Sequence, residues 1–222
     1  MASPRDYKNT IVPNWCPGCG DYGIQNAISA VCAKKGWANE DITLISGIGC
    51  SSRIGGYQYC YGAHTTHGRA LPFAQGIKCA NKDQHMIVCS GDGDSYAIGL
   101  GHAMHAIKRN MDITYLVFDN QVYGLTKGQT SPASDKGFVT KTTPDGNPLT
   151  PLDAPAMALA AGATFVAQAY AIDSKTMINV IERAVDHKGF SYVNIFTPCV
   201  TFNHLNTCLL YTSPSPRDLS TS

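Results

Sequence analysis

Short apolar runs that are rich in β-branched residues alternate along this chain with segments of helical periodicity. This alternation predicts a mostly parallel sheet flanked by helices, which is a doubly wound α/β fold. Asp21 is expected to cap the first helix and Gly36 to stop it. The predicted strands cover residues 42–45, 86–89, 113–118, 164–167 and 192–196, and the predicted helices cover residues 21–31, 95–108, 153–161 and 174–187.

Two segments depart from this alternation. Residues 126–151 are rich in glycine and proline and show no sustained period, which indicates a functional or partner-bound loop. Residues 208–222 have the composition of a disordered segment and are similar to translated sequencing-adaptor read-through. We therefore expect one native domain over residues 1–207 and a non-native tail over residues 208–222.

Charge and cysteine usage narrow the functional class. The chain has 17 Lys and Arg against 16 Asp and Glu, a net charge of +1, which disfavours a nucleic-acid-binding surface. Nine cysteines in a chain whose first residues lack a signal-peptide core disfavour a secreted disulfide framework, so we expect a cytoplasmic protein. No apolar run approaches the roughly 18 residues that a membrane span needs.

A Gly91-Asp92-Gly93 turn directly follows one predicted strand and precedes a helix, at the sheet edge where ligands bind. Its glycines let backbone amides approach a phosphate, and the helix N-terminus adds positive potential. Asp92 would repel that phosphate unless a cation lies between them, and Mg²⁺ is the natural bridge. Asn120 follows the next strand and is expected at the same edge as a second ligand. Taken alone, the Gly91-Asp92-Gly93 sequence is also compatible with a purely structural role, as a tight turn in which Asp92 is a capping residue.

Four cysteines lie where the predicted fold brings chain segments to this edge. Cys16 and Cys19 precede the first helix, while Cys50 and Cys199 each follow a strand. The Cys16-Pro17-Gly18-Cys19 motif is compatible with a redox pair, half a zinc site or part of an iron–sulfur site. Spacing alone leaves a four-cysteine cluster and scattered structural thiols equally open. Three other cysteines are expected to be buried, small apolar residues: Cys32, Cys79 and Cys89.

As a set, the motifs resemble the β subunit of the 2-oxoacid:ferredoxin oxidoreductases, most closely the two-subunit 2-oxoglutarate or broad 2-oxoacid branch. The resemblance runs from about Asn14 to Asn206 and implies a thiamine-diphosphate-binding fold. The segments that carry it are Asn14-Trp15-Cys16-Pro17-Gly18-Cys19-Gly20, Gly47-Ile48-Gly49-Cys50-Ser51, His64-Thr65-Thr66-His67-Gly68-Arg69, Gly91-Asp92-Gly93-Asp94, Asp119-Asn120-Gln121-Val122-Tyr123-Gly124-Leu125-Thr126 and Thr197-Pro198-Cys199-Val200.

The resemblance implies three sets of ligands. Mg²⁺ would be held by Asp92, Asn120 and the backbone carbonyl of Val122. A 4Fe-4S cluster would be held by Cys16, Cys19, Cys50 and Cys199. Thiamine diphosphate would be held by Ile48, Gly49, Cys50, Ser51, His67, Gly93, Asp94, Gly124 and Leu125.

The resemblance also implies an activity and its partners. A 2-oxoacid, with 2-oxoglutarate as the expected substrate, would be oxidatively decarboxylated to acyl-coenzyme A and CO₂. The electrons would pass through the cluster to ferredoxin. Activation of thiamine in the wider family needs a glutamate at the aminopyrimidine ring. The chain contains only Glu40, before a strand at the amino edge, and Glu182, in mid-helix. We therefore expect a partner α subunit to supply the glutamate and the single chain to be inactive.

Substrate and reaction class leave alternatives open. Arg53 and Lys127 lie by motif near the thiamine loops and are candidates for holding a substrate carboxylate, with a solvated surface charge as the alternative for each. Pyruvate is the alternative substrate. The alternative functions are a non-redox thiamine-diphosphate decarboxylase or carboligase, and a redox-inactive module that uses Cys16 and Cys19 for zinc or a disulfide.

Overall fold

Six parallel strands form the central sheet in the computed structural model, which describes residues 2–203. They are β1 (Ile42–Ser46), β2 (Tyr61–His64), β3 (His85–Gly91), β4 (Ile113–Asp119), β7 (Phe165–Tyr170) and β8 (Phe190–Phe196). The spatial order is β2-β1-β3-β4-β8-β7, and every neighbouring pair is parallel. From β1 the chain winds to β2 on one side and from β3 to the remaining strands on the other. The predicted doubly wound parallel sheet is confirmed.

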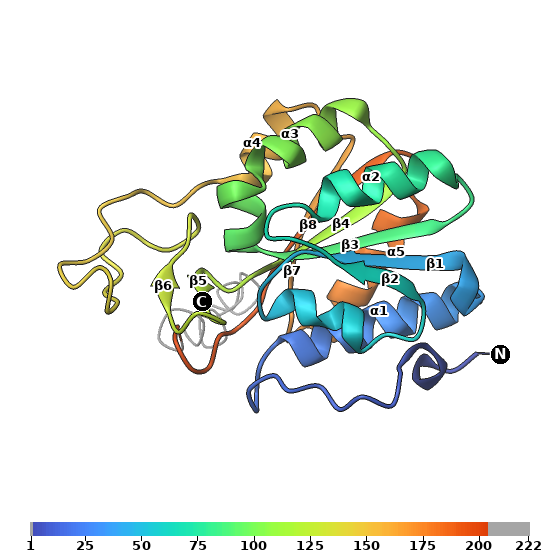
Figure 1. Cartoon of the computed structure of the whole chain (residues 1–222), viewed down its shortest axis with the longest axis horizontal. Helices are drawn as coiled ribbons and strands as arrows, with labels where there is room; N and C mark the ends of the chain where they lie inside the picture. Colours follow the sequence, from blue (N-terminus) through green and yellow to red (C-terminus); the bar gives the residue numbers. More distant parts are fainter. Residues whose placement is uncertain (1, 204–222) are drawn as a thin grey trace, which may run out of the picture.

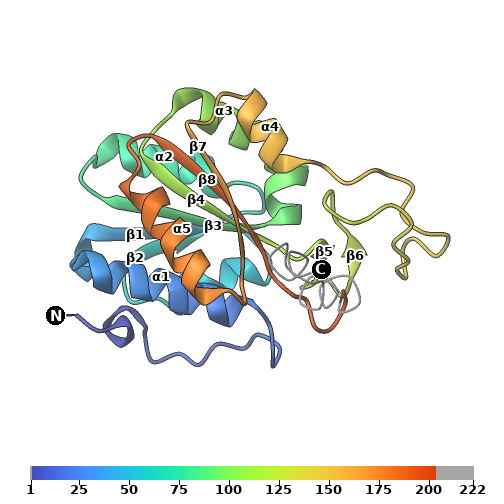
Figure 2. The same ribbon diagram turned by 180° about the vertical axis from the view of Figure 1, so that it is seen from behind.

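Helices cover both faces of this sheet (Figure 1). Helices α1 (Asp21–Lys35) and α5 (Ser174–Asp186) lie on one face, and α2 (Ala70–Ala80), α3 (Leu100–Arg109) and α4 (Ala154–Ala160) lie on the other (Figure 2). Successive side chains of a strand point to opposite faces. Ile87 and Cys89 of β3 therefore belong to the core on the side of α1 and α5, whereas Met86 and Val88 belong to the core on the side of the other three helices.

Shorter elements lie at the ends of the strands and in the loops. Three are 3₁₀ helices and one is a π-helix: η1 (Pro4–Tyr7), η2 (Asn39–Asp41), η3 (Ser51–Gly56) and the π-helical η4 (Asp94–Ile98). A two-stranded hairpin of β5 (Val122–Tyr123) and β6 (Gln129–Thr130) follows β4. Beyond it, the chain runs irregularly to α4 and projects away from the sheet, as predicted for most of residues 126–151 (Figure 1).

Two helix predictions need correction. Asp21 was expected to cap α1, but the N-cap residue is Gly20 and no side chain caps this end. The Asp21 carboxyl is instead buried, and Thr197 Oγ1 donates to its Oδ1 at 3.4 Å. The helix predicted over residues 95–108 is divided into η4 and α3 at Gly99, where a Cβ atom would lie 2.4 Å from the Asp94 carbonyl oxygen.

The strand β2 and most of α2 lack a clear signal in the sequence. β2 is an edge strand whose residues are largely exposed, so it has no apolar run. Cys79, in the last turn of α2, is exposed, and its predicted burial is wrong because its position lies on the solvent side of this turn, next to the buried Lys78. Cys32 and Cys89 are buried as predicted.

Residues 204–222, which include the whole predicted tail (residues 208–222) and its boundary after residue 207, lie outside the described part of the chain. Within residues 2–203, no helix combines the length and the hydrophobicity that crossing a bilayer requires.

Candidate cofactor site

Three loops meet at the carboxyl edge of the sheet, where the winding direction changes between β1 and β3. They follow β1, β3 and β4, and together with the segment around His67 they line a cavity. Every residue predicted to hold thiamine diphosphate or Mg²⁺ lines this cavity. These residues are Ile48, Gly49, Cys50, Ser51, His67, Asp92, Gly93, Asp94, Asn120, Val122, Gly124 and Leu125.

We call this cavity the phosphate-site cavity. Close backbone packing shapes it where the Gly91-Asp92-Gly93 turn meets Tyr123. A Cβ atom on Gly93 would lie 2.1 Å from Tyr123 Cε1, so only glycine fits beneath the tyrosine ring. Tyr123 Oη donates to the Gly93 carbonyl at 3.1 Å and so fixes the β5–β6 hairpin over the Gly91-Asp92-Gly93 turn. Sequence reasoning did not single out Tyr123, although it lies inside the motif that contains Asn120.

Asp92, one of the predicted Mg²⁺ ligands, is a buried carboxylate, and Asp119 is a second buried carboxylate whose negative charge acts on it. Asp92 is 2% exposed, and burial together with the negative charge of Asp119 raises the pKa of its carboxyl well above the ordinary value. Burial also raises the pKa of Asp119 to about 6. Because an ionised carboxylate in such surroundings needs compensation, a cation bound in this cavity would stabilise the ionised form of Asp92. The donor set therefore fits Mg²⁺.

Local hydrogen bonds fix the other two predicted Mg²⁺ ligands. Val122 N donates to Asn120 Oδ1 at 3.1 Å across a turn in which Gln121 has a φ of 58°. This turn sets the Asn120 side chain and the backbone of Val122 side by side. Ser131 Oγ donates to Asp92 Oδ2, a contact that comes from the irregular segment and that the sequence did not reveal.

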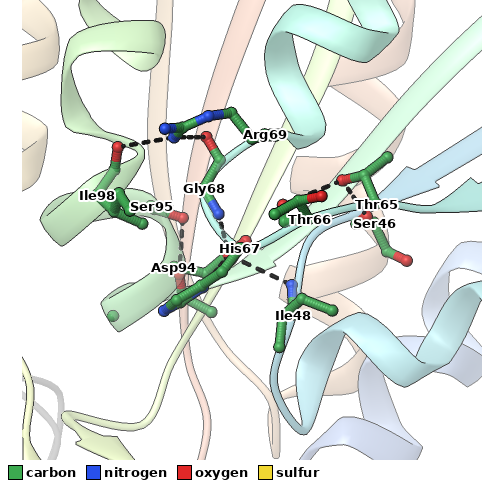
Figure 3. A network of polar contacts seen from close by, with 12 residues as sticks. Ser46, Ile48, Thr65, Thr66, His67, Gly68, Arg69, Asp94, Ser95 and Ile98 are labelled. Carbon is green, nitrogen blue, oxygen red and sulfur yellow. Dashed lines mark hydrogen bonds and ion pairs between the residues drawn. The ribbon is translucent and has the colours of Figure 1, made fainter.

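Asp94 connects three segments of the phosphate site (Figure 3). Its Oδ1 accepts hydrogen bonds from Gly68 N at 2.6 Å and from Ile48 N at 3.2 Å, and it lies 2.5 Å from His67 Nδ1. The Asp94 side chain is 1% exposed, whereas that of His67 is 38% exposed. The carboxylate thus lies behind the loops and the imidazole lies at the cavity.

A second cavity, of about 300 Å³, is lined by all four cysteines predicted to bind a cluster. Cys16 and Cys19 come from the loop before α1, Cys50 follows β1, and Cys199 follows β8. Trp15 Nε1 donates to the Cys50 carbonyl at 2.7 Å and ties two of these segments together. Four residues line both this thiol cavity and the phosphate-site cavity: Cys50, Asn120, Gly124 and Leu125.

The thiols surround the cavity without meeting at one point. Among residues 2–203, no three His, Cys, Asp or Glu side chains are close enough to share a single metal ion. A 4Fe-4S cluster binds each thiolate through a different iron, so its ligands are spread around a larger body. Burial raises the pKa of Cys50 to about 11 and raises that of Cys19 further, and metal binding would release these protons. The donor set fits a multinuclear cluster better than a lone zinc ion.

The two cationic residues predicted to hold the substrate, and the two glutamates, do not line the phosphate-site cavity. Arg53 and Lys127 line the thiol cavity rather than the phosphate-site cavity. Glu40 lies in η2 at the amino edge. Glu182, on α5, forms an ion pair with Lys34 of α1 at 2.6 Å. Neither glutamate lines either cavity, as expected from the sequence.

Comparison with known proteins agrees with this geometry. The family model for the C-terminal, TPP-binding domain of thiamine pyrophosphate enzymes matches residues 47–195. A 2-oxoglutarate synthase subunit KorB from Archaeoglobus fulgidus is 43% identical over 206 residues, which cover 92% of this chain and 77% of that protein. The chain belongs to the β-subunit family of the 2-oxoacid:ferredoxin oxidoreductases. This family includes proteins named 2-oxoglutarate synthase subunit KorB.

Other members of this β-subunit family are also similar, over part of their length. The 2-oxoglutarate oxidoreductase subunit KorB of Mycobacterium tuberculosis is 44% identical over 90% of this chain, which spans 53% of that protein. The Saccharolobus solfataricus 2-oxoacid:ferredoxin oxidoreductase subunit beta is 44% identical over 87% of this chain and 64% of its own length. The chain therefore spans about half to two thirds of these two relatives.

A solved structure of the family extends the likeness to three dimensions. The 2-oxoglutarate:ferredoxin oxidoreductase from Magnetococcus marinus, with 2-oxoglutarate, coenzyme A and succinyl-CoA bound, matches all of this chain and 77% of its own. The TM-score is 0.93 at 43% sequence identity. The fold of the β-subunit family is thus present throughout the described residues.

Proposed function

We propose that this chain is the β subunit of an enzyme that oxidatively decarboxylates a 2-oxoacid, with 2-oxoglutarate as the preferred substrate, to acyl-coenzyme A and CO₂. The observation that carries the proposal is the wall shared by the two cavities. Cys50 and Gly124 belong to this wall and line both the phosphate-site cavity and the thiol cavity. Thiamine diphosphate supplies the electron sink for decarboxylation. A redox cluster directly behind its site would receive the electrons that this reaction releases.

The residues of the chain divide into three roles in this proposal. Asp92, Asn120 and the Val122 carbonyl hold Mg²⁺, and the loops that follow β1, β3 and β4 hold the diphosphate of the cofactor. Cys16, Cys19, Cys50 and Cys199 bind the 4Fe-4S cluster. The buried carboxylates and the raised pKa values of Cys19 and Cys50 support these assignments, because bound cations would stabilise the ionised forms.

The reaction requires partners that this chain does not provide. An α subunit supplies the glutamate that activates thiamine, since Glu40 and Glu182 are distant from the site. Coenzyme A accepts the acyl group and ferredoxin accepts the electrons. Eight free thiols among the described residues fit a reducing compartment, and we place the enzyme in the cytoplasm.

Arg53 and Lys127 support a dicarboxylic substrate. The described lining of the thiol cavity contains these two cations and no carboxylate. Lys127 adopts a φ of 78° in a turn closed by the Lys127 N to Gly124 O hydrogen bond of 3.1 Å, so its backbone is fixed beside the shared wall. A cation held there would attract the distal carboxylate of 2-oxoglutarate, which pyruvate lacks.

The decisive experiment is anaerobic purification of the full-length subunit with its α subunit, followed by assays for iron, sulfide and thiamine. We expect all three, together with coenzyme A-dependent reduction of ferredoxin. Thiamine without iron would instead indicate a decarboxylase or carboligase, and zinc alone would indicate a redox-inactive module.

Substrate preference is tested on the same complex. We expect kcat/KM to be higher for 2-oxoglutarate than for pyruvate, and Lys127→Gln to raise KM for 2-oxoglutarate more than KM for pyruvate. Arg109→Gln, on α3, is a matched loss of a cation away from both cavities. A strong preference for pyruvate would overturn the substrate assignment.

A further inference from the structure

Asp94 presents a conflict of charge if it acts by touching the cofactor. A diphosphate and a carboxylate repel each other, and Asp94 lies in the same cavity lining as the loops that would hold the diphosphate. Unlike Asp92, it has no place among the predicted Mg²⁺ ligands. Its hydrogen bonds indicate a different role.

The protein itself occupies Asp94 Oδ1. That oxygen accepts from Ile48 N in the loop after β1 and from Gly68 N in the segment before α2, and it contacts His67 Nδ1 (Figure 3). Hydrogen bonds to an ionised acceptor are among the stronger ones in proteins. One buried oxygen atom therefore joins two loops to η4, the element that carries Asp94.

The surrounding backbone is packed to accept this carboxylate and little else. A Cβ atom on Gly47 would lie 1.8 Å from Asp94 Oδ2. A Cβ atom on Gly68, whose φ is 70°, would lie 2.7 Å from Gly99 N at the end of η4. Arg69 Nη1 also donates to the Ile98 carbonyl at 3.2 Å, which holds the same segment against η4.

We propose that Asp94 is a positioning residue: its carboxylate holds the loop after β1 and the His67 segment in the arrangement that receives the diphosphate, and it directs the free edge of the His67 ring toward the cavity. The inference rests on the proposed function, because it assumes that a diphosphate binds there. With Nδ1 fixed on Asp94, Nε2 is the ring nitrogen left for a ligand. The loops are preorganised, so binding does not have to order them.

The sign of the effect of a neutral substitution distinguishes this role from simple proximity. If Asp94 only lay beside the diphosphate, Asp94→Asn would remove a repulsion and tighten binding. If Asp94 holds the loops, the same substitution leaves Ile48 N, Gly68 N and His67 Nδ1 with a weaker, uncharged acceptor. We then expect thiamine diphosphate and inorganic pyrophosphate to bind about tenfold to hundredfold more weakly.

The experiment measures binding rather than turnover. The apo form of the full-length complex with its α subunit is titrated with thiamine diphosphate, and separately with inorganic pyrophosphate, in the presence of Mg²⁺ and followed by calorimetry. Hydrogen exchange is measured on peptides that cover residues 47–51 and 66–69. In Asp94→Asn we expect faster exchange in these two peptides and unchanged exchange in residues 113–119 of the central strand β4. Asp173→Asn, at the N-cap of α5, is the matched control.

Each outcome bears on one of the two proposals. If the wild-type complex binds no thiamine diphosphate, the proposed function fails. If the wild type binds it and Asp94→Asn binds it equally or more tightly, the positioning role is wrong. Faster exchange throughout the subunit would show a general structural role instead and would also overturn the proposal.

A second variant tests the same contact independently of Asp94→Asn. Gly47→Ala keeps the carboxylate but places a methyl group against Oδ2, which forces Asp94 to move. We expect weaker pyrophosphate binding from Gly47→Ala in the wild-type background and little additional loss in an Asp94→Ala background. Gly76→Ala, at an open position on α2, is the control, and equal losses from Gly47→Ala in both backgrounds would contradict the proposal.

Discussion

The Cys50 thiol at the shared wall is better suited to metal binding than to disulfide exchange. Burial raises the pKa of Cys50 to about 11, so this side chain is a neutral thiol near pH 7 when no metal is bound. Neutral thiols are poor nucleophiles, and a bound iron converts them to thiolates by displacing their protons. Cluster assembly should therefore become more favourable as the pH rises.

Loss of one cluster ligand is the most direct test at the scale of single residues. We expect Cys199→Ala to lose most of its iron and sulfide, because three thiolates leave one iron without a protein ligand. Cys79→Ala, which removes an exposed thiol on α2, should retain both at wild-type amounts. Iron and sulfide are measured after anaerobic purification. Full cluster content in Cys199→Ala would remove this residue from the ligand set.

The stability of the protein should depend on pH through His85. Its ring stacks on that of Trp37 with the centroids 3.8 Å apart. Burial and the nearby charge of Lys78 lower the pKa of His85 below its ordinary value of 6.5. The unfolded chain therefore binds more protons here than the folded chain, and the stabilisation present above pH 6.5 is lost as the pH falls through the lower, folded-state pKa.

The thermal midpoint of the wild type should accordingly fall between pH 7 and pH 5, and part of this fall should disappear in His85→Phe, which keeps a ring for stacking. Differential scanning calorimetry at several pH values measures it. His105→Gln, an exposed substitution on α3, is the control. An identical pH dependence in the wild type and in His85→Phe would contradict the prediction.

Among the elements, the C-terminal end of α1 follows local chemistry that the sequence reveals, whereas its N-cap and the interruption between η4 and α3 do not. Gly36 was predicted to end α1, and it does so in the left-handed conformation with a φ of 64°. The π-helical turn of η4 was not predicted, because it depends on Gly99 packing against the carbonyl of Asp94 and on the contact of Asp94 with two distant loops.

Two glycine substitutions in the helices should change the free energy of unfolding in opposite directions. Gly36→Ala places a side chain in the left-handed region and should lower the free energy of unfolding by about 1 kcal/mol. Gly101→Ala, at an open position inside α3, should raise it by about 0.5 to 1 kcal/mol through helix propensity. Chemical denaturation of both variants measures the difference, and equal effects of the same sign would contradict this account.

Sequence patterns predicted the fold, and the family resemblance predicted most of the residues that line the cavities, but neither predicted the individual contacts. Strands with apolar runs and polar residues directly after them locate one sheet edge, so Asp92 and Asn120 were correctly expected together there. Tyr123, Ser131 and the orientation of Asp21 were missed, because the direction of a side chain depends on how distant segments pack.

At the scale of the whole molecule, both cavities lie at one edge of the sheet and both glutamates lie away from it. The purified single subunit should therefore show no 2-oxoacid-dependent ferredoxin reduction, even when loaded with thiamine diphosphate and iron. Addition of the α subunit should restore turnover, measured as ferredoxin reduction under anaerobic conditions. Measurable turnover by the single subunit would show that activation of thiamine needs no glutamate from a partner.

The wall between the two cavities also couples the constraints on substitution at the two proposed sites. A Cβ atom on Gly124 would lie 3.5 Å from Cys50 Sγ and 3.8 Å from Cys199 Sγ, while the same glycine lines the phosphate site. A bulkier side chain at position 124 would enter the lining of both cavities. In the proposed enzyme, the choice of residue at this one position would therefore be constrained by two bound groups at once.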